Sequence, residues 1–372
     1  MQSGKRVAIL VVAILCGLAL LFIVYRLVQE PAAPALAWSD RSENLWVGIP
    51  ARLRFAMPPD RAAEGAALMD DAFNEIRRTG STCNPFDPTS EVGLFNRENG
   101  RRTFAPSPLL TLLIRLSREA WNRTSGAFDV TVWPLKELWK RAVRDGVPPP
   151  PDDLALALAR VGMQRLVQDQ EGTIQPLDPP VSLDFGGIVK GFAVDRAAEL
   201  LESRGALSGL IQVGGEVRAF GTSPERLPWR VGVRDPRSAT GMLGVVTAAT
   251  RIAISTSGNY EQPVRIAGRD YYHIFDPRTG QPVDTRLMGV TVVIEGGDWP
   301  NATADALATA LAVLPPDEGL ALIESLPGAG VLLLLRGEDG VMVQRVSRRM
   351  AQLYSHGPDL HRESEGKRST GP

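Results

Sequence analysis

The sequence contains very few of the residues that bind soft metals or form disulfides. Only two of its 372 residues are Cys and three are His. Two Cys cannot supply a Cys₄ zinc site, an iron–sulfur cluster or a disulfide framework. Because His356 and His361 lie in a polar C-terminal segment, a centre with three His ligands is not expected either. Any metal site in this chain therefore has to rest on oxygen ligands, which suit hard cations.

The chain also has no excess of positive charge. It carries 41 Lys and Arg against 42 Asp and Glu, a net charge of −1. No sequence-wide basic surface is therefore available for nucleic acid, whose phosphates bind clusters of Lys and Arg. An apolar content of 44% and a charged content of 22% are typical of a globular protein. The 36 Gly and 29 Pro favour a fold with many turns over a helical bundle.

Long hydrophobic runs are absent except at the N-terminus. The uncharged run Val7–Tyr25 is long enough to cross about 30 Å of hydrocarbon as a helix. Lys5 and Arg6 precede the run and only Arg26 follows it, which predicts a cytoplasmic N-terminus and an exported body. We therefore expect a bacterial inner-membrane protein with a periplasmic domain. Cleavage behind the small residues at 35–37 is the alternative.

The sequence divides into four parts. Residues 1–28 are expected to form an uncleaved N-terminal transmembrane helix, 29–38 a linker, 39–355 the folded domain and 356–372 a disordered tail. Apolar periodicity predicts helices over 61–78, 109–124, 154–161, 190–204 and 301–314. Apolar runs predict strands over 210–213, 229–234, 289–294, 330–335 and 341–345. Because helices and strands interleave without regular βαβ units, the predicted class is α+β with a mixed sheet.

Two glycine-containing segments could each hold a ligand or simply form a turn. In Ser125–Thr131, Asp129 could position a ligand, but Gly126 could equally cap the preceding helix. In Ser182–Gly191, a strand runs into paired glycines and then a helix, where free N–H groups and Lys190 would suit a phosphate. The segment lacks the Walker and dinucleotide-binding patterns. The shorter Gly214-Gly215-Glu216 predicts a tight turn or bulge.

Two further positions carry chemistry that the surrounding sequence does not explain. Asp305 and Thr309 are four residues apart and share one face of an otherwise apolar helix. They could bond to the helix backbone or present a carboxylate and a hydroxyl to Mg²⁺. His273 is the one His of the folded domain. It could be structural, or it could belong to an anion-binding pocket with Tyr260, Tyr272 and Arg278.

Taken in order, these segments resemble one family. Over about residues 46–354 the chain is similar to the ApbE family of FAD:protein FMN transferases. The resemblance rests on five blocks in the same order: NPFDPTSEVGLFN (84–96), TSGAFDVTVWPLKELW (124–139), SLDFGGIVKGFAVD (182–195), HIFDPRTGQPV (273–283) and ADALATALAVL (304–314). It implies an ApbE-like α+β fold and an enzyme that binds FAD as substrate and uses Mg²⁺.

The resemblance also assigns roles to particular residues. It implies that the metal is held by the carbonyl of Gly187 and the side chains of Asp305 and Thr309. It places His273 near the reaction centre as proton acceptor, with Asp305 as the second catalytic residue. It implies that the FAD site is lined by Phe86, Ala127, Phe128, Asp129, Asp184, Lys190 and Ile274. Phe86 stands where the family usually has a Tyr against the flavin, which keeps the stacking face and loses the hydroxyl.

The implied reaction joins FMN to a threonine hydroxyl of a target protein through a phosphoester bond and releases AMP. The expected target is a flavoprotein subunit of a membrane electron-transfer complex. Two alternatives stay open: an Mg²⁺-dependent FAD pyrophosphatase that releases FMN and AMP, and a flavin-binding maturation factor without turnover. The family's Met-Gly-Thr signature near the flavin is not evident, and residues 47–50 are its nearest counterpart.

Overall fold

The fold is centred on one eight-stranded sheet. In this computed structural model the described residues are 36–357, except 47, 99–100, 176–177, 239, 249–250, 259–263, 268, 272–273 and 284–285. The strand order is β1-β2-β3-β4-β7-β10-β11-β12, and every neighbouring pair is antiparallel. The strands are β1 (Ala37–Leu45), β2 (Ile49–Met57), β3 (Ser208–Val213), β4 (Glu216–Phe220), β7 (Ile252–Gly258), β10 (Leu287–Ile294), β11 (Ala329–Arg336) and β12 (Met342–Val346).

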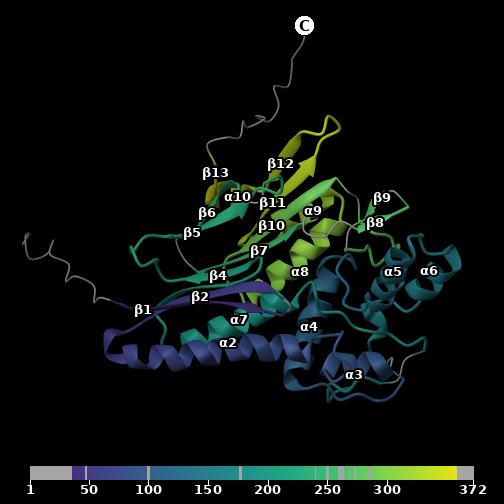
Figure 1. The fold of residues 1–372 in the computed structure, drawn as a ribbon, viewed down its shortest axis with the longest axis horizontal. Coiled ribbons are helices and arrows are strands. Elements are labelled where there is room, and N and C mark those ends of the chain that lie inside the picture. Colours follow the sequence, from purple (N-terminus) through teal and green to yellow (C-terminus); the bar gives the residue numbers. More distant parts are fainter. Residues whose placement is uncertain are drawn as a thin grey trace, which may run out of the picture.

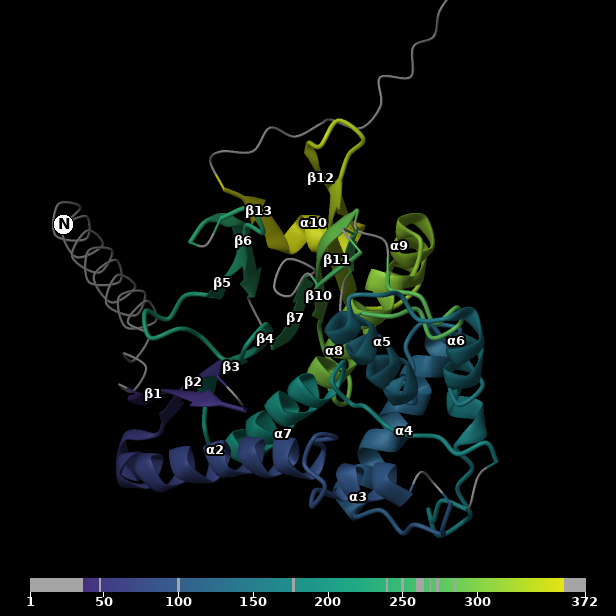
Figure 2. The same cartoon turned by 45° about the vertical axis from the view of Figure 1, so that its right-hand side comes forward.

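Both faces of this sheet are covered, which explains its apolar central strands (Figures 1 and 2). One face packs on three helices: α2 (Gly65–Thr82), α7 (Val189–Ser203) and α8 (Pro300–Val313). The other face packs on α10 (Arg348–Leu353) and on a small sheet of β5 (Trp229–Arg234), β6 (Met242–Ala248) and β13 (Tyr354–His356). In β11, Val331 and Leu333 face the first layer while Leu332 and Leu334 face the second, so the whole strand is apolar.

Residues 83–188 form a largely helical region beside α7 and α8 (Figure 2). It contains α3 (Glu91–Glu98), α4 (Pro108–Arg123), α5 (Trp133–Asp145) and α6 (Pro151–Leu158), and its apolar core includes residues of α7 and α8. The remaining elements are the short helix α9 (Pro316–Glu324), the hairpin β8 (Val264–Ile266)–β9 (Arg269–Tyr271) and two 3₁₀ helices, η1 (Pro59–Glu64) and η2 (Met163–Arg165). Burial raises the pKa of the Cys83 thiol in this core to about 12, so the thiol stays protonated at neutral pH.

The α+β class and the predicted helices and strands are confirmed, with ends that shift by a few residues. The expected mixture of parallel and antiparallel strand pairs is not found among the described residues, whose ladders are all antiparallel. The predicted linker ends earlier than expected, because β1 begins at Ala37 and Trp38 packs edge-on to Trp229 with ring centroids 6.1 Å apart. The predicted tail likewise begins later than expected, because His356 belongs to β13 and its ring contacts that of Tyr354.

The predicted transmembrane helix at 1–28 and residues 358–372 of the predicted tail lie outside the described residues. Within the part of the chain that is described, none of the helices combines the length and the apolar character that crossing a bilayer requires.

Candidate functional site

Most of the predicted site residues surround one pocket of about 230 Å³. The pocket lies where the loop after α4, the start of α7, the end of β7, the segment after residue 273 and α8 meet. Predicted residues that line it are Ala127, Phe128, Asp129, Asp184, Gly187, Lys190, Ile274 and Thr309. The sequence places these residues up to 182 positions apart (127 to 309), so the fold alone brings them together.

The loop after α4 combines the two interpretations that its sequence left open. Gly126 has a left-handed backbone with φ +80°, and its N–H donates to the Trp121 carbonyl at 2.9 Å, so it does cap the helix. Asp129 faces inward: one oxygen accepts from the backbone N–H of Thr131 at 2.8 Å, and the other accepts from Met163 at 2.8 Å. Burial raises the pKa of Asp129 above its ordinary value. Its carboxylate thus holds the loop that shapes the pocket wall.

The segment before α7 supplies a carboxylate and a closely packed glycine. Asp184 accepts from the Gly186 N–H at 2.9 Å and from Lys136 Nζ at 2.6 Å. A Cβ atom at Gly187 would lie 2.8 Å from Thr309 Oγ1, so a larger residue would displace the Thr309 side chain. Thr309 Oγ1 donates to the Gly187 carbonyl at 3.4 Å. Two of the three predicted metal ligands are therefore neighbours.

The third predicted ligand, Asp305, lies in a buried cluster of charges. Lys190 Nζ is 2.9 Å and 3.1 Å from the two Asp305 oxygens, and 3.3 Å from Glu216 Oε1. The side chains of Asp305 and Glu216 are both fully buried, whereas that of Lys190 is 24% exposed. Burial lowers the pKa of Lys190, but the two carboxylates outweigh this effect and raise it above its ordinary value. Lys190 thus binds carboxylates of the protein here, not the open anion site that its sequence context suggested.

The cluster is held in place by a tight contact between α7 and α8. The Gly191 N–H donates to Asp305 Oδ2 at 3.0 Å. Asp195, one turn further along α7, accepts from the first backbone N–H groups of α8, those of Asn301 at 3.1 Å and Ala302 at 2.9 Å. The carboxylate therefore caps the helix that carries Asp305 and Thr309.

Asp195 should make the stability of the fold depend on pH. Burial raises its pKa from 3.8 to about 7, so the folded state holds the proton more tightly than the unfolded state. The resulting stabilisation is complete below pH 3.8 and is lost as the pH rises through about 7. We expect the free energy of unfolding, measured by urea denaturation, to fall less between pH 5 and pH 8 in Asp195→Asn than in the unaltered chain. Asp235→Asn, whose carboxylate lies outside the site, should show the same fall as the unaltered chain. An unaltered decline in Asp195→Asn would contradict the assignment.

Phe86 lies beside the pocket with an exposed ring. It is 59% exposed, and its ring meets Trp133 edge-on with centroids 5.0 Å apart. Lys136 Nζ, which lines the pocket, and Lys140 Nζ lie 5.7 Å and 5.4 Å from the ring centroid. An exposed aromatic ring beside the pocket-lining Lys136 suits a planar ligand.

Other predicted positions are placed differently or are not described. His273, Tyr260 and Tyr272 lie outside the described residues. Arg278 does not line the pocket, because its guanidinium is bound to Asp276 at 2.9 Å within the turn that follows. The nearest counterpart of the Met-Gly-Thr signature falls on the β1–β2 turn, and its described residues 48–50 are not part of the pocket wall.

Sequence reasoning assigned no site role to several residues of this region, among them Lys136, Glu216 and Thr256. Lys136 and Thr256 line the pocket, and Glu216 contacts Lys190. The predicted turn at Gly214-Gly215 is confirmed by the register of Val213 opposite Glu216. A signal for Glu216 was available: the segment EVRAF carries charged residues among apolar ones, and buried charges are unusual in a sheet centre.

The oxygen groups of this site fit a hard cation. The described residues contain no cluster of three His, Cys, Asp or Glu side chains. The candidate ligands are instead a carbonyl, a hydroxyl and one carboxylate, the types that Mg²⁺ accepts together with water and phosphate. In the adjoining cluster, when Lys190, Asp305 and Glu216 are all ionised, the two carboxylates face a single ammonium. A cation would compensate the remaining negative charge.

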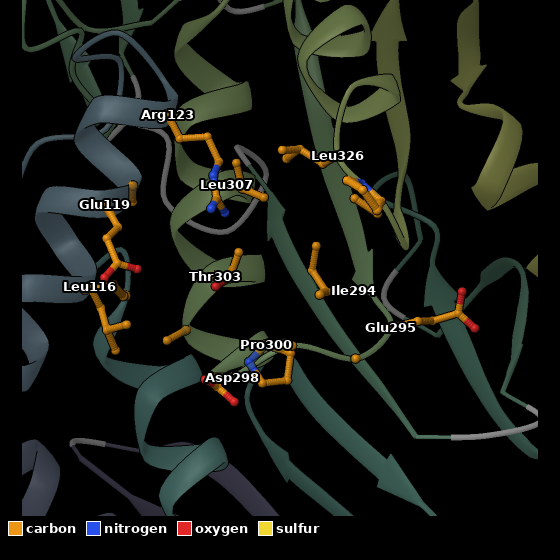
Figure 3. A pocket seen from close by; sticks show the side chains of 17 residues that line it. Leu116, Glu119, Arg123, Ile294, Glu295, Asp298, Pro300, Thr303, Leu307 and Leu326 are labelled. Carbon is orange, nitrogen blue, oxygen red and sulfur yellow. The ribbon is translucent and has the colours of Figure 1, made fainter.

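A second hollow lies elsewhere against α8 and shares no lining residue with the first (Figure 3). Its volume is about 290 Å³. Glu119 and Arg123 of α4 stand on one side, Thr303 and Leu307 of α8 beside them, and the β10–α8 loop below (Figure 3). Of the predicted site residues that the structure describes, none lines this hollow.

Comparison with known proteins identifies the family. The model of the ApbE family matches residues 47–333. A FAD:protein FMN transferase of Haemophilus influenzae is 33% identical over 289 residues, covering 73% of this chain and 79% of that protein. One from Vibrio cholerae is 30% identical over 282 residues, covering 75% and 82%.

Solved structures agree with the sequence relatives. The flavin transferase ApbE of Vibrio cholerae superposes with a TM-score of 0.73 at 26% identity, covering 86% of this chain and 99% of that one. The apo form of the Pseudomonas stutzeri flavinyl transferase ApbE also gives 0.73 at 26% identity, with 87% and 98% covered. The sequence match over most of the chain and the shared fold together show that this chain belongs to the ApbE family.

Proposed function

We propose that this chain is a transferase that moves the FMN part of FAD onto a threonine hydroxyl of a target protein and releases AMP. The observation that carries the proposal is the single pocket in which the residues of four separate family blocks meet. Relatives of this chain are named FAD:protein FMN transferase. In the proposed step the threonine oxygen bonds to the FMN phosphorus while the bond from that phosphorus to the AMP oxygen breaks.

The residues of the pocket would have different roles in this reaction. The Gly187 carbonyl, the Thr309 hydroxyl and the Asp305 carboxylate would hold Mg²⁺, which supplies positive charge to the pyrophosphate. Phosphoryl transfer depends mainly on positioning and on such charge, so the protein needs no covalent nucleophile of its own. His273, by the family resemblance, would take the threonine proton. Ala127 and Phe128, held by the Asp129 loop, would shape the wall against FAD, and Phe86 would stack on the flavin.

The activity is tested with full-length chain in detergent, FAD, Mg²⁺ and a candidate acceptor protein. The expected result is an acceptor heavier by one FMN, with AMP released in equal amount, and no product in EDTA. Free FMN and AMP with an unlabelled acceptor would indicate the pyrophosphatase instead. FAD that stays intact with every acceptor and metal would leave only a flavin-binding role.

Replacing Phe86 by alanine should weaken FAD binding without loss of the fold. A stacked aromatic contact contributes about 1 kcal/mol, so we expect the KM for FAD to rise about fivefold. Phe86→Tyr keeps the aromatic face and should leave the KM nearly unchanged. Steady-state kinetics with varied FAD checks both variants. An unchanged KM in Phe86→Ala would remove Phe86 from the flavin site.

We further propose that residues 1–28 anchor the enzyme in the bacterial inner membrane with the catalytic domain in the periplasm. The target would then be a flavoprotein subunit of a membrane electron-transfer complex. The uncharged run and its flanking charges support this proposal. Protease added to spheroplasts should digest the domain while the N-terminus stays protected. A domain that becomes accessible only after lysis would contradict the orientation.

A further inference from the structure

Glu216 is a buried carboxylate that the proposed reaction does not use. It opens β4 in the middle of the large sheet and is fully buried. Its side chain points at the site, because Oε1 lies 3.3 Å from Lys190 Nζ. Burial and the nearby Asp305 carboxylate raise the pKa of Glu216 above its ordinary value, and Lys190 offsets only part of this increase. Burying such a group is costly unless a charged partner compensates it.

Lys190 is shared unequally between the two carboxylates. Its ammonium is hydrogen-bonded to both Asp305 oxygens, at 2.9 Å and 3.1 Å, whereas the Glu216 Oε1 atom at 3.3 Å has no hydrogen-bond partner. The Asp305 oxygens are therefore occupied by Lys190 and by the Gly191 N–H. A divalent cation that takes Asp305 would meet the ammonium at short range, where two positive charges repel strongly in a buried site. Glu216 is a second carboxylate within reach of the Lys190 ammonium.

We propose that Glu216 is a positioning residue that receives the Lys190 ammonium when a divalent cation binds Asp305. The 3.3 Å approach means that a small movement of the flexible lysine side chain completes the transfer. Each carboxylate then has its own positive partner, whereas without the cation the two carboxylates share one ammonium. This inference rests on the cation site of the proposed function, and it adds a role that the other pocket residues cannot fill.

The test measures binding of Mg²⁺ alone to the full-length chain by calorimetry, without FAD or acceptor. Glu216→Gln keeps the side-chain shape but removes the charge, so Lys190 should stay on Asp305 and Mg²⁺ should bind about tenfold more weakly, a change of about 1.4 kcal/mol. In a Lys190→Met background no ammonium competes, so adding Glu216→Gln should change the affinity by less than about twofold. Glu75→Gln is the matched control: it alters a carboxylate that pairs with Arg196 of α7, outside the site.

Each outcome separates the alternatives. An unchanged affinity in Glu216→Gln overturns the positioning role and leaves the cation site intact. A tenfold loss that persists in the Lys190→Met background shows that Glu216 binds the cation itself, which also overturns it. If the unaltered chain takes up no Mg²⁺, the cation part of the proposed function fails first.

A structure of the unaltered chain with Mg²⁺ covers the case in which Glu216→Gln does not fold. The Lys190 ammonium should then lie closer to Glu216 than to Asp305. An ammonium that still spans both Asp305 oxygens beside the bound cation would overturn the proposal.

Discussion

Asp305→Ala is expected to reduce FMN transfer about a thousandfold, which corresponds to about 4 kcal/mol in the barrier. The reason is that Asp305 is the one carboxylate among the proposed cation ligands. The acidic side chains that line the described part of the pocket, Asp184 and Asp129, accept from Lys136 and from the Met163 N–H and are not among these ligands. The assay follows labelled acceptor at saturating FAD and Mg²⁺. Because Lys190 keeps Glu216 as a partner, the fold should survive the change.

Two controls accompany this variant. Asp305→Asn preserves the shape and should lose activity to a similar degree, because an amide neutralises no cation. Asp317→Ala removes an exposed carboxylate from the adjoining helix α9, where it pairs with surface Arg345, and should transfer FMN at the normal rate. Near-ultraviolet circular dichroism establishes that all three variants are folded. Substantial transfer by folded Asp305→Ala would remove this residue from the reaction.

Gly191→Ala should destabilise the domain by about 3 kcal/mol or more, near the upper end for overpacked sites. A Cβ atom at this position would lie 2.1 Å from the Asn301 carbonyl oxygen and 2.9 Å from the Ala302 nitrogen. These are backbone atoms at the start of α8, so the added methyl group cannot be accommodated by a side-chain rotation. The two helices have to separate, and the Gly191 N–H bond to Asp305 is lost with them. Urea denaturation of the variant measures the free energy of unfolding.

Gly340→Ala provides the comparison for Gly191→Ala. Gly340 has φ +80° in the β11–β12 turn, and a Cβ atom added there would meet no described atom within 4 Å. The substitution therefore tests backbone strain alone and should cost about 1 kcal/mol. Equal losses in the two variants would show that the contact between α7 and α8 is not the cause. FAD affinity should fall only in Gly191→Ala.

The elements that the sequence predicts well are those whose signal is local. The start of α4 is marked by Ser107 before Pro108, and Ser107 Oγ does accept from the Leu110 N–H at 3.3 Å. The strand β1 is not predicted, because its sequence, AWSDRSENL, is polar at an exposed sheet edge and carries little apolar pattern. The strand β4 is not predicted either, since Glu216 and Arg218 interrupt its apolar residues.

The sequence predicts which residues belong to the site, but not which residues they bind. Local motifs indicate Asp184, Lys190 and Asp305, and the fold places all three at or beside one pocket. The partner of Lys190, in contrast, is 115 residues away, and nothing local distinguishes a lysine that binds phosphate from one that binds a buried carboxylate. Asp129 is likewise expected to face a ligand, whereas its partner Met163 becomes visible only when α4 and the loop after α6 are packed together.

The sheet order also determines when the site can first exist during synthesis. The pocket needs the end of β7 and the α8 residue Thr309 as well as Gly187 and Lys190, and α8 follows β10, which pairs with β7. A chain that ends before residue 309 therefore lacks part of the pocket wall, although the loops that form the opposite wall have already been made. In the proposed function, flavin can be taken up only after α8 has packed against α7, so occupancy of the pocket would report that this late step of folding has occurred.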